Sequence, residues 1–311
     1  MSRATISFPR GPRGLGCGLA LGLGLAGFAS GCGTDPQPAR APQGAPSPTS
    51  PPPAGLAGGR PGGAAADGGV ELDAGAATSS ACPPDMQHVQ MNFCPDMERH
   101  CLKNEYDKAN RLSICHRFKE GLQTCRAPRV ALDFCIDRYE FPNELGKRPR
   151  VMVDWYEATG ECAALGKRLC YESEWVAACE GPRETPFPYG WARSSEMCNI
   201  DNRWISPSLK KIYSPDPSIS GPELERLWQG VPSGSKAGCV SGFGVHDLTG
   251  NVDEWALADR DRPEERAVFA ALKGGAWGHV RNACRPVTTS HEPEFRYYFV
   301  SFRCCRDPGA G

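Results

Sequence analysis

Apolar residues are distributed unevenly along the chain, and their pattern divides it into three parts. Residues 14–29 form a continuous apolar stretch that is rich in glycine and leucine. Residues 33–80 contain no aromatic residue, whereas residues 81–306 carry short apolar runs broken by glycine and hold all seven tryptophans. Only this third part has the length and composition to bury one sizeable core. Its short runs predict a loop-rich α+β domain.

The same pattern predicts two short helices inside the folded part. Residues 154–165 place apolar side chains three or four positions apart and are followed by Gly166, which would end a helix. Residues 172–179 place Trp175 and Cys179 one helical turn apart and begin with acidic residues, which suit a helix N-terminus.

Residues 242–255 read GFGVHDLTGNVDEW, and we call this segment the signature loop. Its apolar residues are interrupted by three glycines, which predicts a coiled and well-packed loop rather than a helix or strand. Asp247 and Glu254 bracket the coil, and carboxylates together with carbonyl oxygens are the groups that calcium binds. The alternative is a buried loop whose acids only cap turns.

The apolar stretch at residues 14–29 follows three arginines and is too short and glycine-rich for a stable membrane span. This layout is typical of a secretory signal. It ends in Ala-Ser-Gly before Cys32, which resembles a bacterial lipobox. We therefore expect a lipoprotein signal peptide at 1–31 and an acylated Cys32 at the mature N-terminus. The alternative is an ordinary signal peptide cleaved nearby, with Cys32 incidental.

Residues 32–80 are dominated by proline, glycine, alanine and serine. Such a segment cannot bury enough apolar surface to offset its ordering entropy, so it predicts a disordered tether. A tether after a lipidated cysteine predicts a domain held at the cell envelope, on the outer membrane or its periplasmic face. The expected partners are the membrane, through the lipid anchor, and an unidentified envelope protein or glycan.

Fourteen of the sixteen cysteines lie between Cys82 and Cys305, an even number that predicts a disulfide framework in an exported chain. A zinc site would favour C-x-x-C pairs, and the sequence has none. Six cysteines fall in residues 82–135 around a charged middle, residues 103–119, for which we predict helical character. We interpret residues 81–130 as a cysteine-rich N-terminal elaboration packed on the main domain, 131–306. A separate binding module is the alternative.

Charge and the common catalytic motifs exclude several functions. The 35 basic and 36 acidic residues give a net charge of −1, and no basic block is present, so nucleic acid is not an expected partner. No phosphate-binding Gly-Lys-Thr loop and no H-E-x-x-H motif occurs.

The signature loop resembles the "N-G-L-Y-D-M-x-G-N-V-W-E-W" motif of the formylglycine-generating enzyme family, the sulfatase-modifying factors. Other segments resemble family motifs in the family's order, over about residues 85–306. They are FCIDRYEFPN (134–143), VDWYEA (153–158), GKRLCYESEW (166–175), FPYG (187–190), GGAW (274–277) and SFRC (301–304). The resemblance implies a disulfide-rich, C-type-lectin-like formylglycine-generating-enzyme fold.

The resemblance also implies a structural calcium ion. It carries ligand roles onto Asp247, Gly250, Val252 and Glu254, with carboxylate oxygen from Glu254 and backbone carbonyl oxygen from the middle two. Asn199 and Ile200 resemble part of a second calcium site of the family.

The family's disulfides imply a bridge between Cys162 and Cys304. Cys179 also matches a bridged cysteine of the family, but the family's partner position falls at about Thr289, so Cys179 needs another partner.

Active family members use two cysteines, five residues apart, to bind copper(I) and handle the substrate thiol. In this chain the second position falls on Cys284, the first falls on His279, and Ala276 replaces the serine of the motif. Cys284 is also available for a structural disulfide. The first hypothesis is therefore a membrane-tethered domain with a degenerate cysteine pair, serving as a non-catalytic binding or structural envelope protein. The alternative is a copper-dependent oxidoreductase that acts on a protein cysteine through His279 and Cys284.

Overall fold

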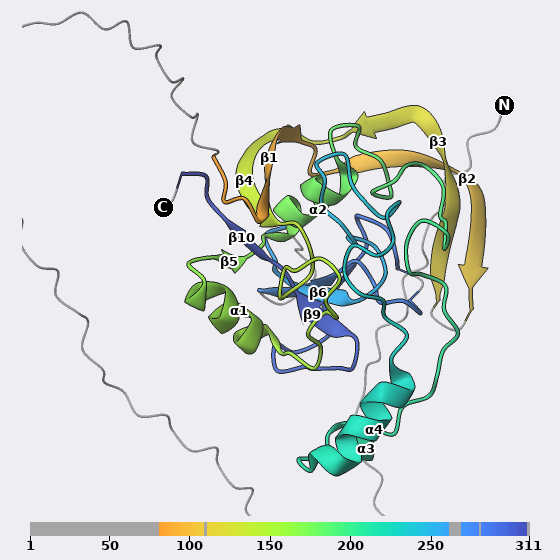
Figure 1. The fold of residues 1–311 in the computed structure, drawn as a ribbon. Coiled ribbons are helices and arrows are strands. Elements are labelled where there is room, and N and C mark those ends of the chain that lie inside the picture. Colours follow the sequence, from red (N-terminus) through yellow and green to blue (C-terminus); the bar gives the residue numbers. More distant parts are fainter. Residues whose placement is uncertain (1–80, 109–110, 261–268, 280, 310–311) are drawn as a thin grey trace, which may run out of the picture. The chain divides into compact units, whose positions relative to one another are not determined.

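The computed structural model describes residues 81–108, 111–260, 269–279 and 281–309 (Figure 1). The expected signal peptide, the tether and Cys32 lie outside the described residues. No helix within these described segments is both long and apolar enough to cross a bilayer.

Two four-stranded sheets organise the described chain. The first has the order β1 (Met86–Phe93), β4 (Val130–Asp137), β10 (Cys304–Arg306) and β5 (Arg168–Leu169). The second has the order β8 (Val287–Thr288), β7 (Ala270–Lys273), β6 (Asp253–Leu257) and β9 (Val300–Phe302). All pairs are antiparallel except β6 and β9. Because β10 lies between β4 and β5, the end of the chain completes the first sheet.

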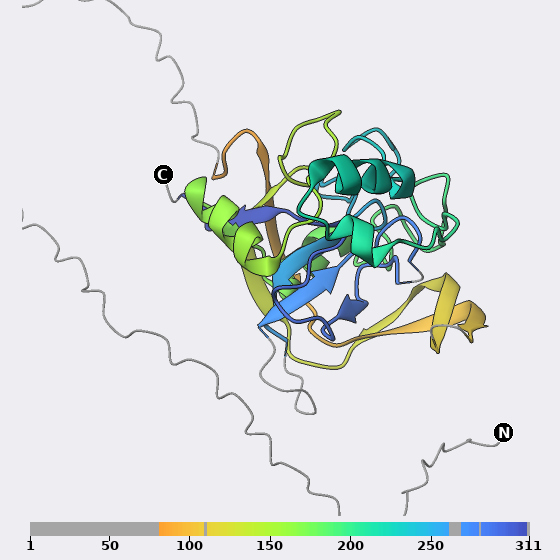
Figure 2. The same cartoon turned by 90° about the horizontal axis from the view of Figure 1, so that it is seen from below.

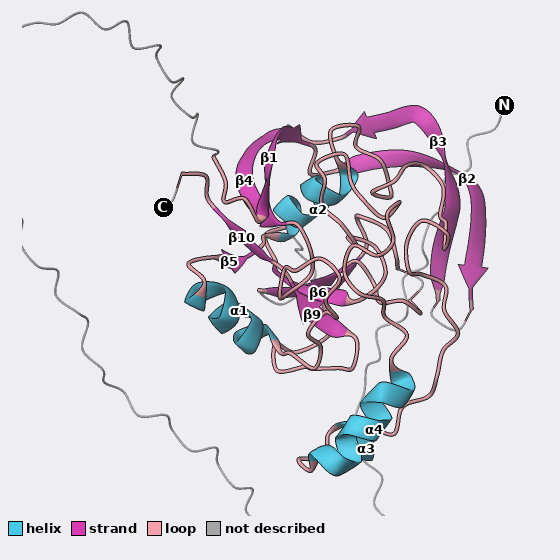
Figure 3. Ribbon diagram, in the orientation of Figure 1, coloured by secondary structure: helices cyan, strands magenta, loops and turns pink. Residues whose placement is uncertain are grey.

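Both predicted helices are confirmed, with small shifts at their ends. Helix α1 (Trp155–Ala164) begins at Asp154, whose side chain accepts a hydrogen bond from the N–H of Glu157 at 2.8 Å in a capping box. Helix α2 (Glu172–Glu180) is followed by Gly181 at a φ of 65°. The pattern did not predict α3 (Leu209–Ile212) or α4 (Pro217–Leu227), which lie side by side at one edge (Figure 3).

The helical prediction for residues 103–119 is wrong. This segment lies in a two-stranded antiparallel ribbon formed by β2 (Met97–Asp107) and β3 (Leu112–Cys125), which curves along one side of the body (Figure 2). The Cys101–Cys115 disulfide joins β2 to β3, and a second disulfide joins Cys94, which precedes β2, to Cys125 at the end of β3. Covalent cross-strand pairing therefore overrides the helix propensity of a charged sequence, which is only a weak local preference.

The N-terminal elaboration is continuous with the main domain. The boundary expected at residue 130 falls on the first residue of β4, and β4 pairs with β1 over eight residues. The ribbon also packs on the domain, because the N–H of Phe118 donates to the carbonyl of Trp191 at 2.9 Å. The rings of Phe118 and Phe187 lie 6.1 Å apart, edge to face.

The core consists of two large apolar clusters, and the signature loop runs between them. Val245 and Leu248 pack with Trp175 of α2 in one cluster, whereas Val252 and Trp255 pack in the other, which includes α1 residues. The first half of the loop is buried in one cluster and the second half in the other, so the polar groups of the loop are held in the interior.

All fourteen cysteines from Cys82 onward are in disulfides. The pairs are Cys82–Cys135, Cys94–Cys125, Cys101–Cys115, Cys162–Cys304, Cys170–Cys305, Cys179–Cys284 and Cys198–Cys239. The disulfide-rich α+β class predicted from the sequence is confirmed.

Candidate functional site

The backbone of the signature loop turns tightly against another segment. Asp247, Gly250 and Asn251 have φ values of 58°, 82° and 55°. A Cβ atom on Gly250 would lie 2.3 Å from the carbonyl oxygen of Asn199, so only glycine fits at that position. The N–H of Asn251 donates to the same carbonyl at 2.9 Å, which fixes the loop on Asn199 and Ile200.

Glu254 forms a fully buried ion pair with Arg303. The guanidinium donates from Nε to Oε2 at 2.6 Å and from Nη2 to Oε1 at 2.7 Å. The indole Nε1 of Trp175 also donates to Oε2 of Glu254, at 2.8 Å. Arg303 has no exposed surface, so this charge-assisted pair ties β6 to the segment before β10 inside the core.

Two further buried carboxyl groups belong to the same cluster. Glu140 accepts hydrogen bonds from Nδ2 of Asn251 at 2.9 Å and from Oγ of Ser233 at 2.6 Å. Asp247 accepts from the N–H of Gly234 at 2.6 Å. Glu140, Asp247, Glu254 and Arg303 are called the acidic cluster below.

The acidic cluster contains more acid than base. Burial raises the pKa of Glu140 well above its usual range, and the nearby carboxylates of Asp247 and Glu254 raise it further. Burial also raises the pKa of Asp247 to about 6, and Glu254 adds to the shift. Three carboxyl groups therefore lie near one guanidinium, and burial favours the protonated form of Glu140 and Asp247. A divalent cation among them would instead favour their ionised forms.

The predicted calcium ligands are oxygen donors, the type that calcium binds. The carbonyl oxygens of Gly250 and Val252 accept no hydrogen bond from a described residue, and Asp247 supplies a buried carboxylate. Glu254 would share its carboxylate with Arg303. Among the described residues, no three His, Cys, Asp or Glu side chains are grouped as metal ligands, so backbone oxygens would complete the site.

The second predicted calcium pair has other partners. The side-chain oxygen of Asn199 accepts from Nδ2 of Asn202 at 3.0 Å, and its backbone oxygen accepts from Asn251. Ile200 is buried and its side chain contacts the signature loop at Gly250. In this structure Asn199 and Ile200 therefore pack against the signature loop and hold it in place.

Cys284, the predicted catalytic cysteine, is bonded to Cys179. Both residues are fully buried, and the N–H of Cys284 donates to the carbonyl of Pro186 at 3.0 Å. Cys284 is thus the disulfide partner of Cys179, because the family's partner position falls at about Thr289, which is not a cysteine. A sulfur atom in a disulfide is not a thiolate, which is the form of cysteine that binds copper(I) and acts as a nucleophile.

His279, the other predicted catalytic residue, is oriented by a carboxylate. Its Nδ1 lies 3.0 Å from Oδ2 of Asp253, and its ring packs edge to face on Phe299 at 4.6 Å. Burial by itself would lower the pKa of His279, but the charge of Asp253 and the hydrogen bond to it raise the pKa above its ordinary value. With Cys284 in a disulfide, His279 and Cys284 do not fit a copper site.

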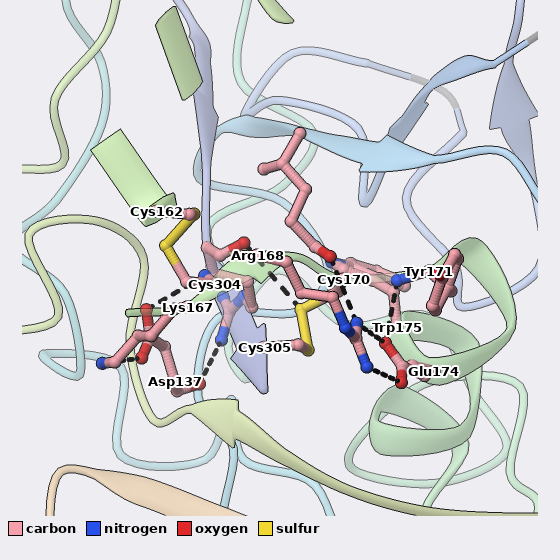
Figure 4. Close-up of a disulfide and its surroundings, with 12 residues drawn as sticks. Asp137, Cys162, Lys167, Arg168, Cys170, Tyr171, Glu174, Trp175, Cys304 and Cys305 are labelled. Carbon is pink, nitrogen blue, oxygen red and sulfur yellow. Dashed lines mark hydrogen bonds and ion pairs between the residues drawn. A yellow bond between two sulfur atoms is a disulfide. The ribbon is translucent and has the colours of Figure 1, made fainter. Parts of the chain in front are cut away.

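Two disulfides anchor β10 beside these clusters (Figure 4). Cys162 of α1 is bonded to Cys304, the pairing that the family resemblance implied, and Cys170 is bonded to Cys305. Asp137 accepts a hydrogen bond from Nζ of Lys167 at 2.6 Å beside the first bridge. The last strand is therefore held covalently to α1 and to the residue that follows β5.

Comparison with known sequences agrees with this geometry. Residues 127–308, more than half of the chain, match the sulfatase-modifying factor enzyme 1-like domain. The chain belongs to this family. The sulfatase-modifying-factor-like domain thus includes the signature loop, the acidic cluster and the Cys179–Cys284 disulfide.

Three curated proteins illustrate the range of the domain. The chain is 27% identical over 167 residues to the inactive C-alpha-formylglycine-generating enzyme 2 of Bos taurus, covering 52% of this chain and 51% of that protein. It is 26% identical over 168 residues to the formylglycine-generating enzyme of Thermomonospora curvata, covering 51% of each. It is 25% identical over 154 residues to the serine/threonine-protein kinase pkn1 of Chlamydia caviae, covering 45% of this chain and 21% of that protein. The chain spans about half of each enzyme and a fifth of the kinase.

Two solved structures have a similar arrangement. CarF covers 72% of this chain and 98% of its own, with a TM-score of 0.45 and 14% identity. PvdO from Pseudomonas aeruginosa covers 73% of this chain and 97% of its own, with a TM-score of 0.38 and 19% identity.

Two central members of the acidic cluster were not predicted from the sequence. Glu140 and Arg303 both lie in segments that resemble family motifs, FCIDRYEFPN and SFRC. Each is a charged residue in a segment with apolar neighbours, which is the available signal of a buried charge. Nothing in the sequence showed that these two distant segments meet at Glu254.

Proposed function

We propose that this sulfatase-modifying-factor-like chain is a lipid-tethered, non-catalytic binding or structural domain of the cell envelope. The disulfide between Cys179 and Cys284 carries the proposal, because it removes the one cysteine that matches the family's catalytic pair. Every cysteine within the described segments is in a disulfide, so none of them presents a thiolate there.

The residues at two other positions of the family's catalytic motif, His279 and Ala276, support the same conclusion. His279 supplies nitrogen in place of sulfur and cannot exchange disulfides with a substrate thiol. Its Nδ1 is engaged by Asp253, and Ala276 supplies no hydroxyl group. The family includes at least one protein described as inactive, the Bos taurus relative. Copper-dependent oxidation of a protein cysteine is the competing function, since another relative carries the name formylglycine-generating enzyme.

We expect the purified, non-reduced protein without its lipidated N-terminus to show no thiol from residues 82–305, even after denaturation. Loading with copper(I) and incubation with a Cys-x-Pro-x-Arg peptide under oxygen should give no aldehyde. Ellman titration and mass spectrometry of the peptide provide the two measurements. A formylglycine-generating enzyme assayed in parallel is the positive control. Aldehyde formation that disappears in Cys284→Ser would establish the oxidoreductase instead.

The tether proposal rests on the sequence of the first 80 residues. We expect Cys32→Ser to release the protein from the membrane fraction, because acylation at Cys32 is the proposed anchor. Fractionation followed by immunoblotting measures the shift. Cys17→Ser, a cysteine inside the apolar stretch, is the matched control and should stay in the membrane fraction. A Cys32→Ser protein that sediments with membranes would contradict the tether.

We also propose a structural calcium ion at Asp247, Gly250, Val252 and Glu254. The buried carboxyl groups of the acidic cluster, whose ionised forms a cation would stabilise, and the two carbonyl oxygens support it. An ion at this position would hold the signature loop and would not take part in a reaction. The proposed partners of the domain are the membrane, through the anchor, and an envelope protein or glycan.

A further inference from the structure

A cavity of about 160 Å³ lies between the β2–β3 ribbon and the loop that carries Cys284. The ribbon contributes Arg99 from β2 and Phe118 from β3, and the loop contributes Arg281 and Arg285. Arg193 completes the polar lining. Four arginines therefore surround one small space, and no aspartate or glutamate is among its described lining residues. We call it the arginine cavity.

Two of these arginines share a single carboxylate. Arg99 donates from Nη2 to Oε1 of Glu180 at 2.6 Å, and Arg285 donates from Nε and Nη2 to the same carboxylate at 2.6 and 2.8 Å. Glu180 is fully buried. One negative charge thus faces two positive charges, so the pair of guanidinium groups retains one unneutralised charge.

Arg99 also has an unused donor inside the protein. Its side chain is 6% exposed, and its Nε is buried without a hydrogen-bond partner among the described residues. Its Nη2 is engaged by Glu180 and by the backbone carbonyl of Glu184. A buried N–H without an acceptor is costly, and an acceptor in the adjacent cavity would remove that cost.

The other two arginines raise the positive charge of the cavity. Arg281 donates from Nη1 to the hydroxyl of Thr288 at 2.6 Å, which is an uncharged partner. Arg193 pairs with Asp201 at 2.6 Å and also donates to Asn282 and to the carbonyl of His279, so it contributes charge more than free donors. Within the described part of the chain, the four guanidinium groups thus face two carboxylates, those of Glu180 and Asp201, which leaves an excess of two positive charges. Glu184 does not alter this balance, because its carboxylate pairs with Arg129.

Covalent bonds hold both walls of the arginine cavity in place. The Cys101–Cys115 disulfide crosses the ribbon, and Cys179–Cys284 fixes the opposite loop. Nζ of the buried Lys273 donates to the carbonyls of Arg285 and Pro286 at 3.2 and 2.9 Å. The donors are therefore positioned before a ligand arrives, which lowers the entropic cost of binding.

We infer that the arginine cavity binds a compact, doubly charged tetrahedral oxyanion, a sulfate or phosphate, either free or as a monoester. Guanidinium groups match the oxygens of such anions in geometry, and the excess of two charges matches a dianion. Apolar walls at Phe118 and Phe187 leave room for the group that an ester would carry. The inference rests on the proposed role as a binding domain and names the class of ligand.

Isothermal titration of the whole chain with sodium sulfate and sodium phosphate tests the site, at constant ionic strength set with chloride. We expect saturable binding of both dianions and markedly weaker binding of acetate. Arg281→Gln removes one charge and, among the described residues, only the side-chain hydrogen bond to Thr288, and it should weaken sulfate binding about tenfold. Ala283→Leu keeps every charge but fills the cavity, and it should also weaken binding. Arg203→Gln, an exposed arginine outside the lining, should bind as the wild type does.

Methyl phosphate distinguishes the two sources of the anion. Binding as tight as that of phosphate would identify a monoester as the ligand, and binding of the free ion alone would identify an inorganic anion. Two results would overturn the inference: sulfate binding that does not saturate, or equal affinity in wild type, Arg281→Gln and Ala283→Leu. Equal affinity for acetate would overturn the assignment of a dianion. Thermal unfolding of each variant verifies that it is folded. The thiol and aldehyde assays are independent of all these outcomes, so failure here leaves the proposed function standing.

Discussion

Arg303→Met should lower the free energy of unfolding by about 3–5 kcal/mol, because it removes one partner of a fully buried ion pair. Glu254 would keep its hydrogen bond from Trp175 but lose both bonds from the guanidinium. The carbonyl of His246 would also lose its donor, which lies at 3.0 Å. The uncompensated carboxylate would then lie near Glu140 and Asp247, whose charges oppose its ionisation.

Urea unfolding followed by tryptophan fluorescence measures this change. Arg126→Met is the matched control, because Arg126 pairs with Glu98 at the exposed surface and should have little influence on stability. The double variant Arg303→Met/Glu254→Gln should recover part of the loss, since it removes the unpaired charge. If Arg303→Met unfolds no more readily than Arg126→Met, the buried cluster does not stabilise the fold as described.

At neutral pH, Asp247→Asn should raise the free energy of unfolding in the absence of calcium and lower it in the presence of calcium. The folded-state pKa of Asp247 is about 6, above the ordinary value of 3.8. Between these values the folded protein holds a proton that the unfolded chain has released, so wild-type stability falls as the pH rises from about 4 to about 7. Asparagine has no such titration, tolerates the left-handed φ of 58° and keeps an acceptor for Gly234. In chelator, the variant should therefore gain up to about 3 kcal/mol on wild type over this range.

With saturating calcium at pH 7, the wild type should instead be more stable than Asp247→Asn. The ionised carboxylate of wild-type Asp247 is a stronger ligand than the neutral amide oxygen, and an ion that binds only the folded state stabilises it by mass action. Thermal unfolding at pH 4 and pH 7, each with chelator and with calcium, measures all four conditions. Parallel pH profiles for the two proteins would contradict the raised pKa. An unchanged midpoint on adding calcium to stripped wild-type protein would contradict the ion.

The features of the site that depend on neighbouring residues could be predicted from the sequence, and those that depend on contacts between distant residues could not. The coil at residues 242–255 follows from three glycines between apolar residues, a pattern that a short segment displays completely. The partner of Glu254 lies 49 residues away at Arg303, and Glu140 lies more than a hundred residues before them. Nothing in the spacing of these residues indicates that they meet, because their contact depends on β10 inserting between β4 and β5.

The cysteines show the same limit in a sharper form. Their even number and the absence of C-x-x-C pairs were sufficient to predict a disulfide framework. The sequence left Cys284 between two roles, catalysis and a structural bridge. Only the approach of α2 to the loop after Gly275 pairs it with Cys179, over a separation of 105 residues. The wrong helix prediction for residues 103–119 has a related cause. Helix propensity depends on neighbouring residues, whereas the two disulfides of the ribbon join residues 31 and 14 positions apart.

The sequence by itself determined the family, the disulfide-rich α+β class, the two helices and the position of the signature loop. Each of these depends on residue type and short spacing, which act along a few neighbouring positions. Apart from Cys162–Cys304, which the family resemblance implied, the tertiary structure alone decided which cysteines bond. It also decided which acids lie near Arg303 and which arginines face one cavity. Those outcomes depend on distances between segments far apart in the chain, and such distances exist only once the hydrophobic clusters and sheets have brought the segments together.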